Sequence, residues 1–406
     1  MEKTTDYQIK TNVQTLPFAI GQVKTGQRLS YLDNLRVIMT VLVVMVHAAV
    51  TYHSLGGWMY QDPVRDETTA ILLSIFVINC QAFFMGLFFF VAGYFTPGSV
   101  DRKGVPQFWK DRLLRLAIPL VAFTLILSKL PIYWNKVAND GLKLPFTQFF
   151  IQYFWTDVDA GPTWFLFVLL IFAAGYGLWR LAASRFMPQN VSANSQRLPV
   201  PGTKAILGFA LVLAAVLFAT CQVNPLAESQ TIFNSITFVV SFMPQYILMF
   251  VAGILAYRND WLSRLPGKTL KLWAWMALSL IIFLPVFTIL GGATSGGLNY
   301  FFSGLYWQCL VMNLWVGLMT VSVSLALILW LRDRKQPQSR LMKTAGANAF
   351  TIYLIHPLVL VPITIALSYS MIHPLVKFGA ASALTVIACF ALASLLRRLP
   401  GAKAIL

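Results

Sequence analysis

The sequence predicts an all-α integral membrane protein, a bundle of about ten transmembrane helices with both termini in the cytoplasm. Of its 406 residues, 58% are hydrophobic and only 11% are charged, and the mean hydropathy is +0.69. Soluble domains carry about 25% charged residues, and an apolar run of roughly 18 residues is long enough to cross a bilayer. This composition excludes a sizeable soluble domain.

Ten apolar segments are long enough to cross a membrane. They cover residues 35–53, 68–95, 112–130, 163–184, 203–221, 231–256, 271–290, 305–330, 347–370 and 374–396. The second, sixth and eighth are the longest, so we expect them to tilt or to lie partly in the interface. The predicted division is a cytoplasmic tail of residues 1–30, a transmembrane domain of residues 31–396 and a short cytoplasmic tail of residues 397–406.

The basic residues predict the direction of insertion. With both termini in the cytoplasm, 26 Lys and Arg residues fall in cytoplasmic segments and five fall outside. Cytoplasmic loops are enriched in Lys and Arg, so this split supports the helix count and this orientation. The net charge of +17 then indicates contact with anionic membrane lipid and an anionic cytosolic ligand, and it does not call for nucleic acid.

The first segment carries two ionisable residues at membrane depth, Arg36 and His47. Eleven residues make about three helical turns, so the two side chains share one helix face, roughly 16 Å apart along the axis. Such groups usually line a polar cavity or a site. Asp33 can pair with Arg36 or cap the helix. The alternatives are an Arg36 that reaches lipid phosphate and a His47 hydrogen-bonded to a neighbouring helix.

His356 lies at a similar depth in the ninth segment, so it and His47 can meet in one cavity. Pro357 cannot donate to the Tyr353 carbonyl, and we expect that oxygen to be free beside Tyr353 and His356. The sequence shows no clear third ligand, so we expect no metal. His53 and His373 are expected to face solvent at the outer surface.

Two further groups of residues suit a substrate. Arg112 and Arg115 share a helix face at the cytoplasmic side, where guanidinium groups grip phosphate, although both also suit simple membrane anchors. On the outer side, Asp157, Asp159 and Trp164 combine carboxylates with an aromatic ring. This combination suits a carbohydrate acceptor, and the alternative is an interfacial aromatic belt with solvated acids.

At this point the motifs resemble the membrane acyltransferase-3 family. The resemblance runs over roughly residues 30–370. It is carried by Leu32-Asp33-Asn34-Leu35-Arg36 with His47, by Phe89–Phe95, by Arg112-Leu113-Leu114-Arg115, by Trp164-Phe165-Leu166 and by Tyr353-Leu354-Ile355-His356-Pro357. One departure is Ala92, where the family commonly has serine.

The resemblance implies a multi-pass enzyme of the inner (plasma) membrane. It would move an acyl group, such as acetyl or succinyl, from cytosolic acyl-coenzyme A to a hydroxyl of a glycan or related acceptor at the outer side. It implies His47 as the principal catalytic residue and Arg36, Arg112 and Arg115 as donor-binding residues. The glucan-modifying branch is the nearest subgroup. Acyl-coenzyme A would be a substrate, and no permanently bound cofactor is expected.

The expected chemistry assigns supporting roles and leaves alternatives open. His356 would be a second catalytic residue that orients His47 or holds an oxyanion, with Asp33 and Tyr353 in support. Direct transfer and an acyl-histidine relay are equally compatible with the sequence. The alternative functions are a proton-coupled transporter of an organic anion and a non-catalytic acyltransferase relative.

Overall fold

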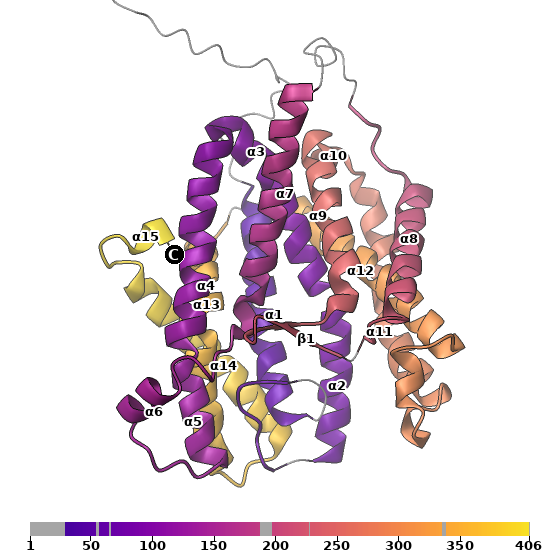
Figure 1. Ribbon diagram of the computed structural model, residues 1–406. Coiled ribbons are helices and arrows are strands. Elements are labelled where there is room, and N and C mark those ends of the chain that lie inside the picture. The colour runs from indigo at the N-terminus through magenta and orange to yellow at the C-terminus, as the bar shows by residue number, and fades with distance from the viewer. Residues whose placement is uncertain are drawn as a thin grey trace, which may run out of the picture.

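The computed structural model of the protein describes residues 29–53, 57–64, 66–186, 197–226, 228–334 and 338–405. Residues 1–28 of the expected cytoplasmic tail, which was predicted to cover residues 1–30, therefore lie outside the described part. Nearly all of that part is helical (Figure 1).

The long helices are α1 (Ser30–Tyr52), α2 (Glu67–Gln81), α3 (Phe84–Arg112), α7 (Trp164–Phe186), α8 (Thr203–Cys221), α9 (Met243–Arg258), α11 (Leu270–Leu290), α12 (Trp307–Asp333), α13 (Arg340–Ser368) and α14 (Pro374–Leu396). Shorter helical pieces are η1 (Leu113–Ala117), α4 (Ile118–Ala122), η2 (Phe123–Leu127), α5 (Lys129–Asn139), α6 (Phe146–Gln152), η3 (Gly161–Thr163), η5 (Val240–Phe242), α10 (Trp261–Arg264), η6 (Gly267–Thr269), η7 (Ala293–Ser295), η8 (Leu298–Phe301) and α15 (Ala402–Ile405). The strands β1 (Gln230–Ile232) and β2 (Ile236–Phe238) form one antiparallel hairpin.

Nine helical stretches of the described residues are long and apolar enough to cross a membrane. One of them, Glu67–Asn139, has 73 residues. At about 1.5 Å per residue it is far too long for one passage through a hydrocarbon core of roughly 30 Å. Its helical geometry breaks at Gly104 (φ 74°), within α3. Figure 1 shows the chain turning back near the α3 label at the top of the molecule. Counted as two passes, it gives the ten that the sequence predicts, and the all-α membrane fold is confirmed.

The predicted second segment, residues 68–95, is not one helix. It is interrupted between α2 and α3 at Ala82 and Phe83. The Ala82 carbonyl, freed by the break, accepts hydrogen bonds from Gln245 Nε2 at 2.6 Å and Thr320 Oγ1 at 2.7 Å. A broken helix is tolerated inside a membrane where neighbouring helices satisfy the freed backbone groups, as α9 and α12 do here.

Helices α3 and α9 pack most closely where each has a glycine. A Cβ atom on Gly93 would collide with the carbonyl oxygen of Phe250, and one on Gly253 would collide with that of Phe90. Small residues let helix backbones approach in this way, and such contacts drive helix association in lipid. The crossing fixes α3, which forms part of the cavity wall.

The predicted sixth segment, residues 231–256, begins as a hairpin and not as a helix. Thr231 pairs with Thr237 across β1 and β2, and α9 begins only at Met243. Along β2 the side chains alternate between buried and exposed, which is the period of a strand. The turn places Phe233 (φ 55°) and Asn234 (φ 53°) in the left-handed region, which ends any helix there.

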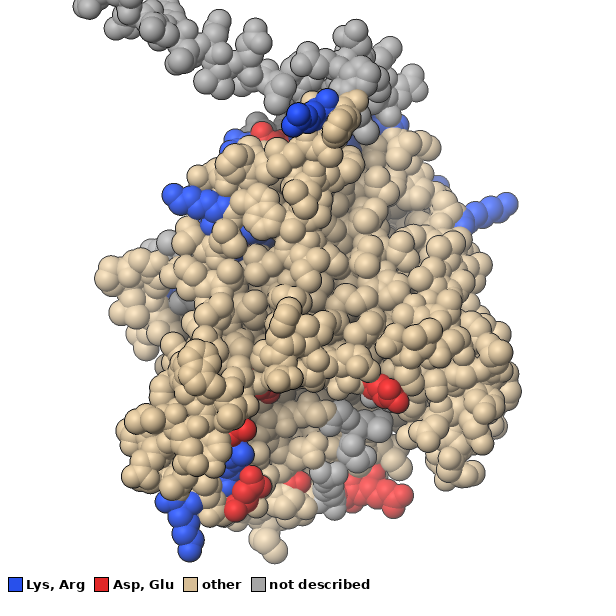
Figure 2. Space-filling model, in the orientation of Figure 1, with Lys and Arg blue, Asp and Glu red and all other residues tan. Residues whose placement is uncertain are grey.

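The two ends of the molecule differ in charge. Lys and Arg gather at the end where α1 and α13 begin, and Asp and Glu gather mainly at the opposite end (Figure 2). We call these the basic end and the acidic end. The described acids in the connections at the acidic end are Asp62, Asp66, Glu67, Asp140, Asp157, Asp159 and Glu228.

Candidate active site

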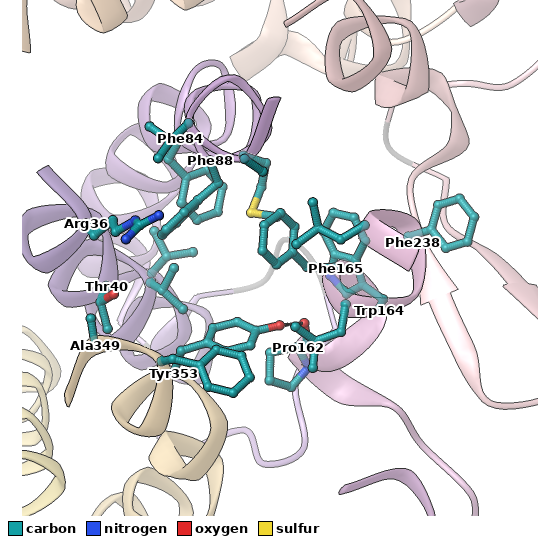
Figure 3. Close-up of a pocket in the computed structure, with 18 of the residues that line it drawn as sticks. Arg36, Thr40, Phe84, Phe88, Pro162, Trp164, Phe165, Phe238, Ala349 and Tyr353 are labelled. Carbon is teal, nitrogen blue, oxygen red and sulfur yellow. Dashed lines mark hydrogen bonds between the residues drawn. The ribbon is translucent and has the colours of Figure 1, made fainter. Parts of the chain in front are cut away.

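A cavity of about 710 Å³ connects residues near the two ends of the bundle. Figure 3 shows Arg36 on one side of it and Phe238 on the other, with Phe165 and Tyr353 between them. Its lining includes Arg36, Arg112, Arg115 and Arg397 toward the basic end, Thr40, His47, Phe84, Phe88, Phe165 and Tyr353 in the middle, and Trp164, Ser229, Thr237 and Phe238 toward the acidic end.

The two histidines predicted to meet do so: His47 lines the cavity, and His356 is buried beside it without being a lining residue. His47 Nδ1 lies 3.1 Å from His356 Nε2, and His356 Nδ1 lies 2.7 Å from the Tyr353 carbonyl oxygen. A carbonyl only accepts, so we infer that His356 Nδ1 carries a hydrogen and, in the neutral ring, that Nε2 accepts from His47 Nδ1. This leaves His47 Nε2 without a proton, a lone pair able to act as base or nucleophile.

The sequence led us to expect a free Tyr353 carbonyl, and this expectation is wrong. Pro357 does remove its usual helical donor, but the His356 ring turns back one turn and takes the vacant place. The Tyr353 side chain lines the cavity, and its hydroxyl donates to the Pro162 carbonyl (Figure 3). Tyr353 thus links α13 to the start of α7 beside the histidine pair.

Trp58 is a site residue that sequence reasoning missed. Its ring stacks on His47 with centroids 4.2 Å apart and an interplanar angle of 27°. It also lies parallel to His356, with centroids 6.0 Å apart. Trp58 lies in an irregular loop where no periodicity predicts a contact, and its only signal is that it is aromatic.

The loop that carries Trp58 is held down by a buried ion pair. Asp62 Oδ2 lies 3.5 Å from Lys377 Nζ, and both side chains are essentially fully buried. The Asp62 backbone N–H also donates to the Thr51 carbonyl at 3.0 Å, which draws the loop over the end of α1. His53 is buried, so the expectation that it faces solvent is wrong, whereas His373 is exposed as expected.

The arginines near the basic end differ in how they are held. Arg36 lies 3.5 Å from Asp33 and has its guanidinium over the Phe95 ring, and Arg112 lies over the Phe108 ring. Arg115 is exposed. All three predicted donor-binding residues line the cavity, whereas Asp33 is not among its lining residues.

Arg397 is a fourth arginine in the lining that the sequence did not single out. It follows α14 and donates to the Ala347 carbonyl near the start of α13. A basic residue after the last apolar segment looked like an ordinary membrane anchor. Only the packing of α14 against α13 brings it to the cavity.

The three acceptor-side candidates lie in different surroundings. Trp164 lines the cavity, but Asp157 and Asp159 are not among its lining residues. Asp157 pairs with Lys136 at 3.4 Å, and Asp159 Oδ1 accepts from the Gly161 N–H at 2.7 Å. Burial raises the pKa of the Asp159 carboxyl, and this hydrogen bond partly opposes the rise.

Metal-ligand geometry is absent from the part of the chain that the structure describes, where no group of three His, Cys, Asp or Glu side chains could hold an ion. The four cysteines are free and buried, and Cys221 Sγ lies 3.2 Å from Cys309 Sγ.

Comparisons of the sequence with known proteins identify a family. The model of the acyltransferase-3 family, described as an acyltransferase domain, matches residues 29–394. The glucans biosynthesis protein C of Escherichia coli K12 is 24% identical over 241 residues, which cover 57% of this chain and 59% of that protein. The same protein from E. coli strain SMS-3-5 matches with the same identity and coverage. The match thus spans less than two thirds of the length of these curated relatives.

No solved structure matches the chain. The family match rests on nearly the whole described membrane region, and it includes the histidine pair and three of the cavity's arginines, Arg36, Arg112 and Arg115. The chain therefore belongs to the acyltransferase-3 family.

Proposed function

We propose that the protein is a membrane-embedded O-acyltransferase. It moves an acyl group from cytosolic acyl-coenzyme A to a hydroxyl of a glycan or related acceptor at the outer side of the inner membrane. The observation that carries the proposal is the His47–His356 pair, of which His47 lines a cavity whose lining at the basic end includes arginines. Membership of the acyltransferase-3 family supports it.

The cavity suits the shape of an acyl-coenzyme A donor. Coenzyme A has phosphate groups at one end and the reactive thioester at the end of a long arm. Arg36, Arg112 and Arg115 offer guanidinium groups for the phosphates, since arginine binds phosphate through paired hydrogen bonds. From Arg36 to His47 is about three helical turns, roughly 16 Å, so a bound arm would bring the thioester to the imidazole.

Two routes are chemically balanced with His47 Nε2 as the acting atom. In the direct route, Nε2 takes the proton of the acceptor hydroxyl while the hydroxyl oxygen attacks the thioester carbonyl carbon. The C–S bond breaks, and the proton passes to the departing thiolate. The products are the ester and free coenzyme A.

In the relay route, His47 Nε2 attacks the carbonyl carbon and the C–S bond breaks. The Nδ1 proton moves to His356 Nε2, which leaves a neutral acyl-histidine. The acceptor oxygen then attacks the acyl carbon, the C–N bond breaks, and Nδ1 recovers its proton. The hydroxyl proton goes to the thiolate, and the products are the same as in the direct route.

The glucan-modifying branch is the finer part of the proposal. It rests on the distant likeness to glucans biosynthesis protein C. It is also supported by the acidic end, where carboxylates can accept hydrogen bonds from sugar hydroxyls.

The test is coenzyme A release by membranes that contain the protein. Acetyl-, succinyl- and longer acyl-coenzyme A are supplied with a glycan extract. We expect release that needs the extract and that falls about 10²- to 10⁴-fold in His47→Ala, since that is the usual contribution of a general base. Coenzyme A release should also fall in His356→Leu, because His47 loses the acceptor that fixes its proton on Nδ1.

Two matched variants control for loss of a histidine or an arginine. His373→Asn keeps a residue able to cap α14, and Arg185→Gln removes an exposed arginine from the last turn of α7. Both should release coenzyme A at the wild-type rate, whereas Arg112→Gln should raise the KM for the donor. Equal release by wild type and His47→Ala would contradict the proposal.

A further inference from the structure

The cavity has a second group of accessible lining residues, on the hairpin. Ser229 and Thr237 are exposed, and both line the cavity. Residues that are both exposed and part of the lining mark a mouth. This mouth lies on the β1–β2 connection between α8 and α9, far along the chain from the arginines.

The hairpin is held against the start of α7 by its buried face. The Ala160 N–H donates to the Ser235 carbonyl at 2.7 Å, and Ile236 and Phe238 pack against Ala160. The Phe238 ring stacks near Trp164, with centroids 6.0 Å apart. An isolated two-stranded hairpin is marginally stable on its own, so these contacts fix its position.

The chemistry of this mouth differs from that of the basic end. It combines two hydroxyl side chains with aromatic rings, and exposed Glu228 directly precedes Ser229. Hydroxyl groups both donate and accept hydrogen bonds, a carboxylate accepts them, and a ring offers a flat apolar face. In Figure 2 the same face is hollowed just below the level at which Figure 1 draws β1, and acidic side chains lie around the hollow.

We propose that the β1–β2 hairpin forms the acceptor mouth, where a polyhydroxylated chain such as a glycan enters and reaches His47. This inference rests on the proposed acyl transfer. It places recognition on Ser229, Thr237 and the Phe238–Trp164 ring pair. It does not use Asp157 and Asp159, which are engaged with Lys136 and the Gly161 N–H.

The chain suits a test by cysteine labelling, because its four native cysteines are all buried. Thr237→Cys places a thiol in the mouth. Thr231→Cys is the matched control: the two threonines pair across the hairpin with their hydroxyls 2.9 Å apart, so either change removes the same hydrogen bond. Thr231 is exposed but is not a lining residue of the cavity.

Both variants are labelled from the outer side with a bulky, membrane-impermeant maleimide. We expect labelled Thr237→Cys to show an acceptor KM raised at least about tenfold with the donor KM unchanged, and labelled Thr231→Cys to show neither change. Glycan should slow the labelling of position 237 and leave that of position 231 unaffected. Ser229→Cys repeats the test if Thr237→Cys does not fold.

The two proposals can fail separately. Unlabelled wild-type protein that releases no coenzyme A with any donor would contradict acyl transfer. If the wild type is active, a labelled Thr237→Cys with an unchanged acceptor KM, or labelling that glycan does not slow, would overturn the acceptor mouth alone.

Discussion

Two hydrogen bonds define the protonation of the His47 imidazole. The Tyr353 carbonyl fixes a proton on His356 Nδ1, and His356 Nε2 in turn fixes one on His47 Nδ1. Hydrogen bonds of this kind select the tautomer of a catalytic histidine and hold its ring in place. Pro357 is the underlying cause, because it leaves the Tyr353 carbonyl without its helical donor.

Trp58 offers a test of how the imidazole is held. Trp58→Phe keeps an aromatic face on His47, and Trp58→Ala removes it. Since an aromatic pair contributes about 0.5–1.5 kcal/mol, we expect kcat to fall up to about tenfold in Trp58→Ala and to change little in Trp58→Phe. The measurement is the rate of coenzyme A release at saturating donor and acceptor.

The phenylalanine variant distinguishes stacking from chemistry. Trp58 Nε1 is buried, with no hydrogen-bond partner among the described residues. If Trp58→Phe is as defective as Trp58→Ala, the indole N–H acts in the reaction and the stacking explanation is wrong.

Among single residues, those on continuous helical stretches were the predictable ones. Arg36 and His47 could be placed on one face because α1 is an uninterrupted helix, and Arg112 and Arg115 because they are three residues apart. Trp58 and Arg397 could not be placed, because each comes to the cavity through a loop or a chain end packing on another helix. His53 was misplaced because nothing in the local sequence shows that tertiary packing buries it.

Helices α3 and α9 are held together by a crossing that tolerates no side chain. We expect Gly93→Ala to destabilise the folded protein by about 1–3 kcal/mol or more, since its Cβ would meet the backbone of Phe250, which cannot rotate away. The measurement is the thermal unfolding midpoint in detergent. Gly379→Ala in α14 is the control, because a Cβ there meets nothing within 4 Å.

An unchanged midpoint in Gly93→Ala would show that α3 and α9 are further apart than described. A matching loss in Gly379→Ala would point to a general effect of substituting glycine in a membrane helix. Either result would also count against the position of α3 in the cavity wall, to which it contributes Phe84 and Phe88.

Apolar length predicted where membrane segments lie but not how each begins or breaks. The break at Ala82 depends on donors from Gln245 and Thr320, which are distant in the sequence. The hairpin at 230–238 is as apolar as a helix start, and its period of two extends over too few residues to stand out. The mouth proposed for the acceptor therefore lies in a stretch that hydropathy alone assigns to a helix.

At the scale of the whole molecule, the two ends of the cavity differ in their chemistry. Arginines line the cavity near the basic end, hydroxyl and aromatic residues line it near the acidic end, and His47, in contact with His356, lies between them. Positive residues favour the cytoplasmic side, so this arrangement suits a donor taken from the cytosol and an acceptor met outside. A transporter would share the two ends but would move its substrate without forming an ester.

Transfer across the membrane distinguishes these possibilities most directly. Sealed vesicles with the cytoplasmic face outward and glycan enclosed would be given acyl-coenzyme A labelled in the acyl group, and the glycan would be analysed by mass spectrometry. We predict labelled ester on the enclosed glycan for wild type and none for His47→Ala. Free label that accumulates inside while the glycan stays unlabelled, or ester formation that survives His47→Ala, would contradict acyl transfer at His47.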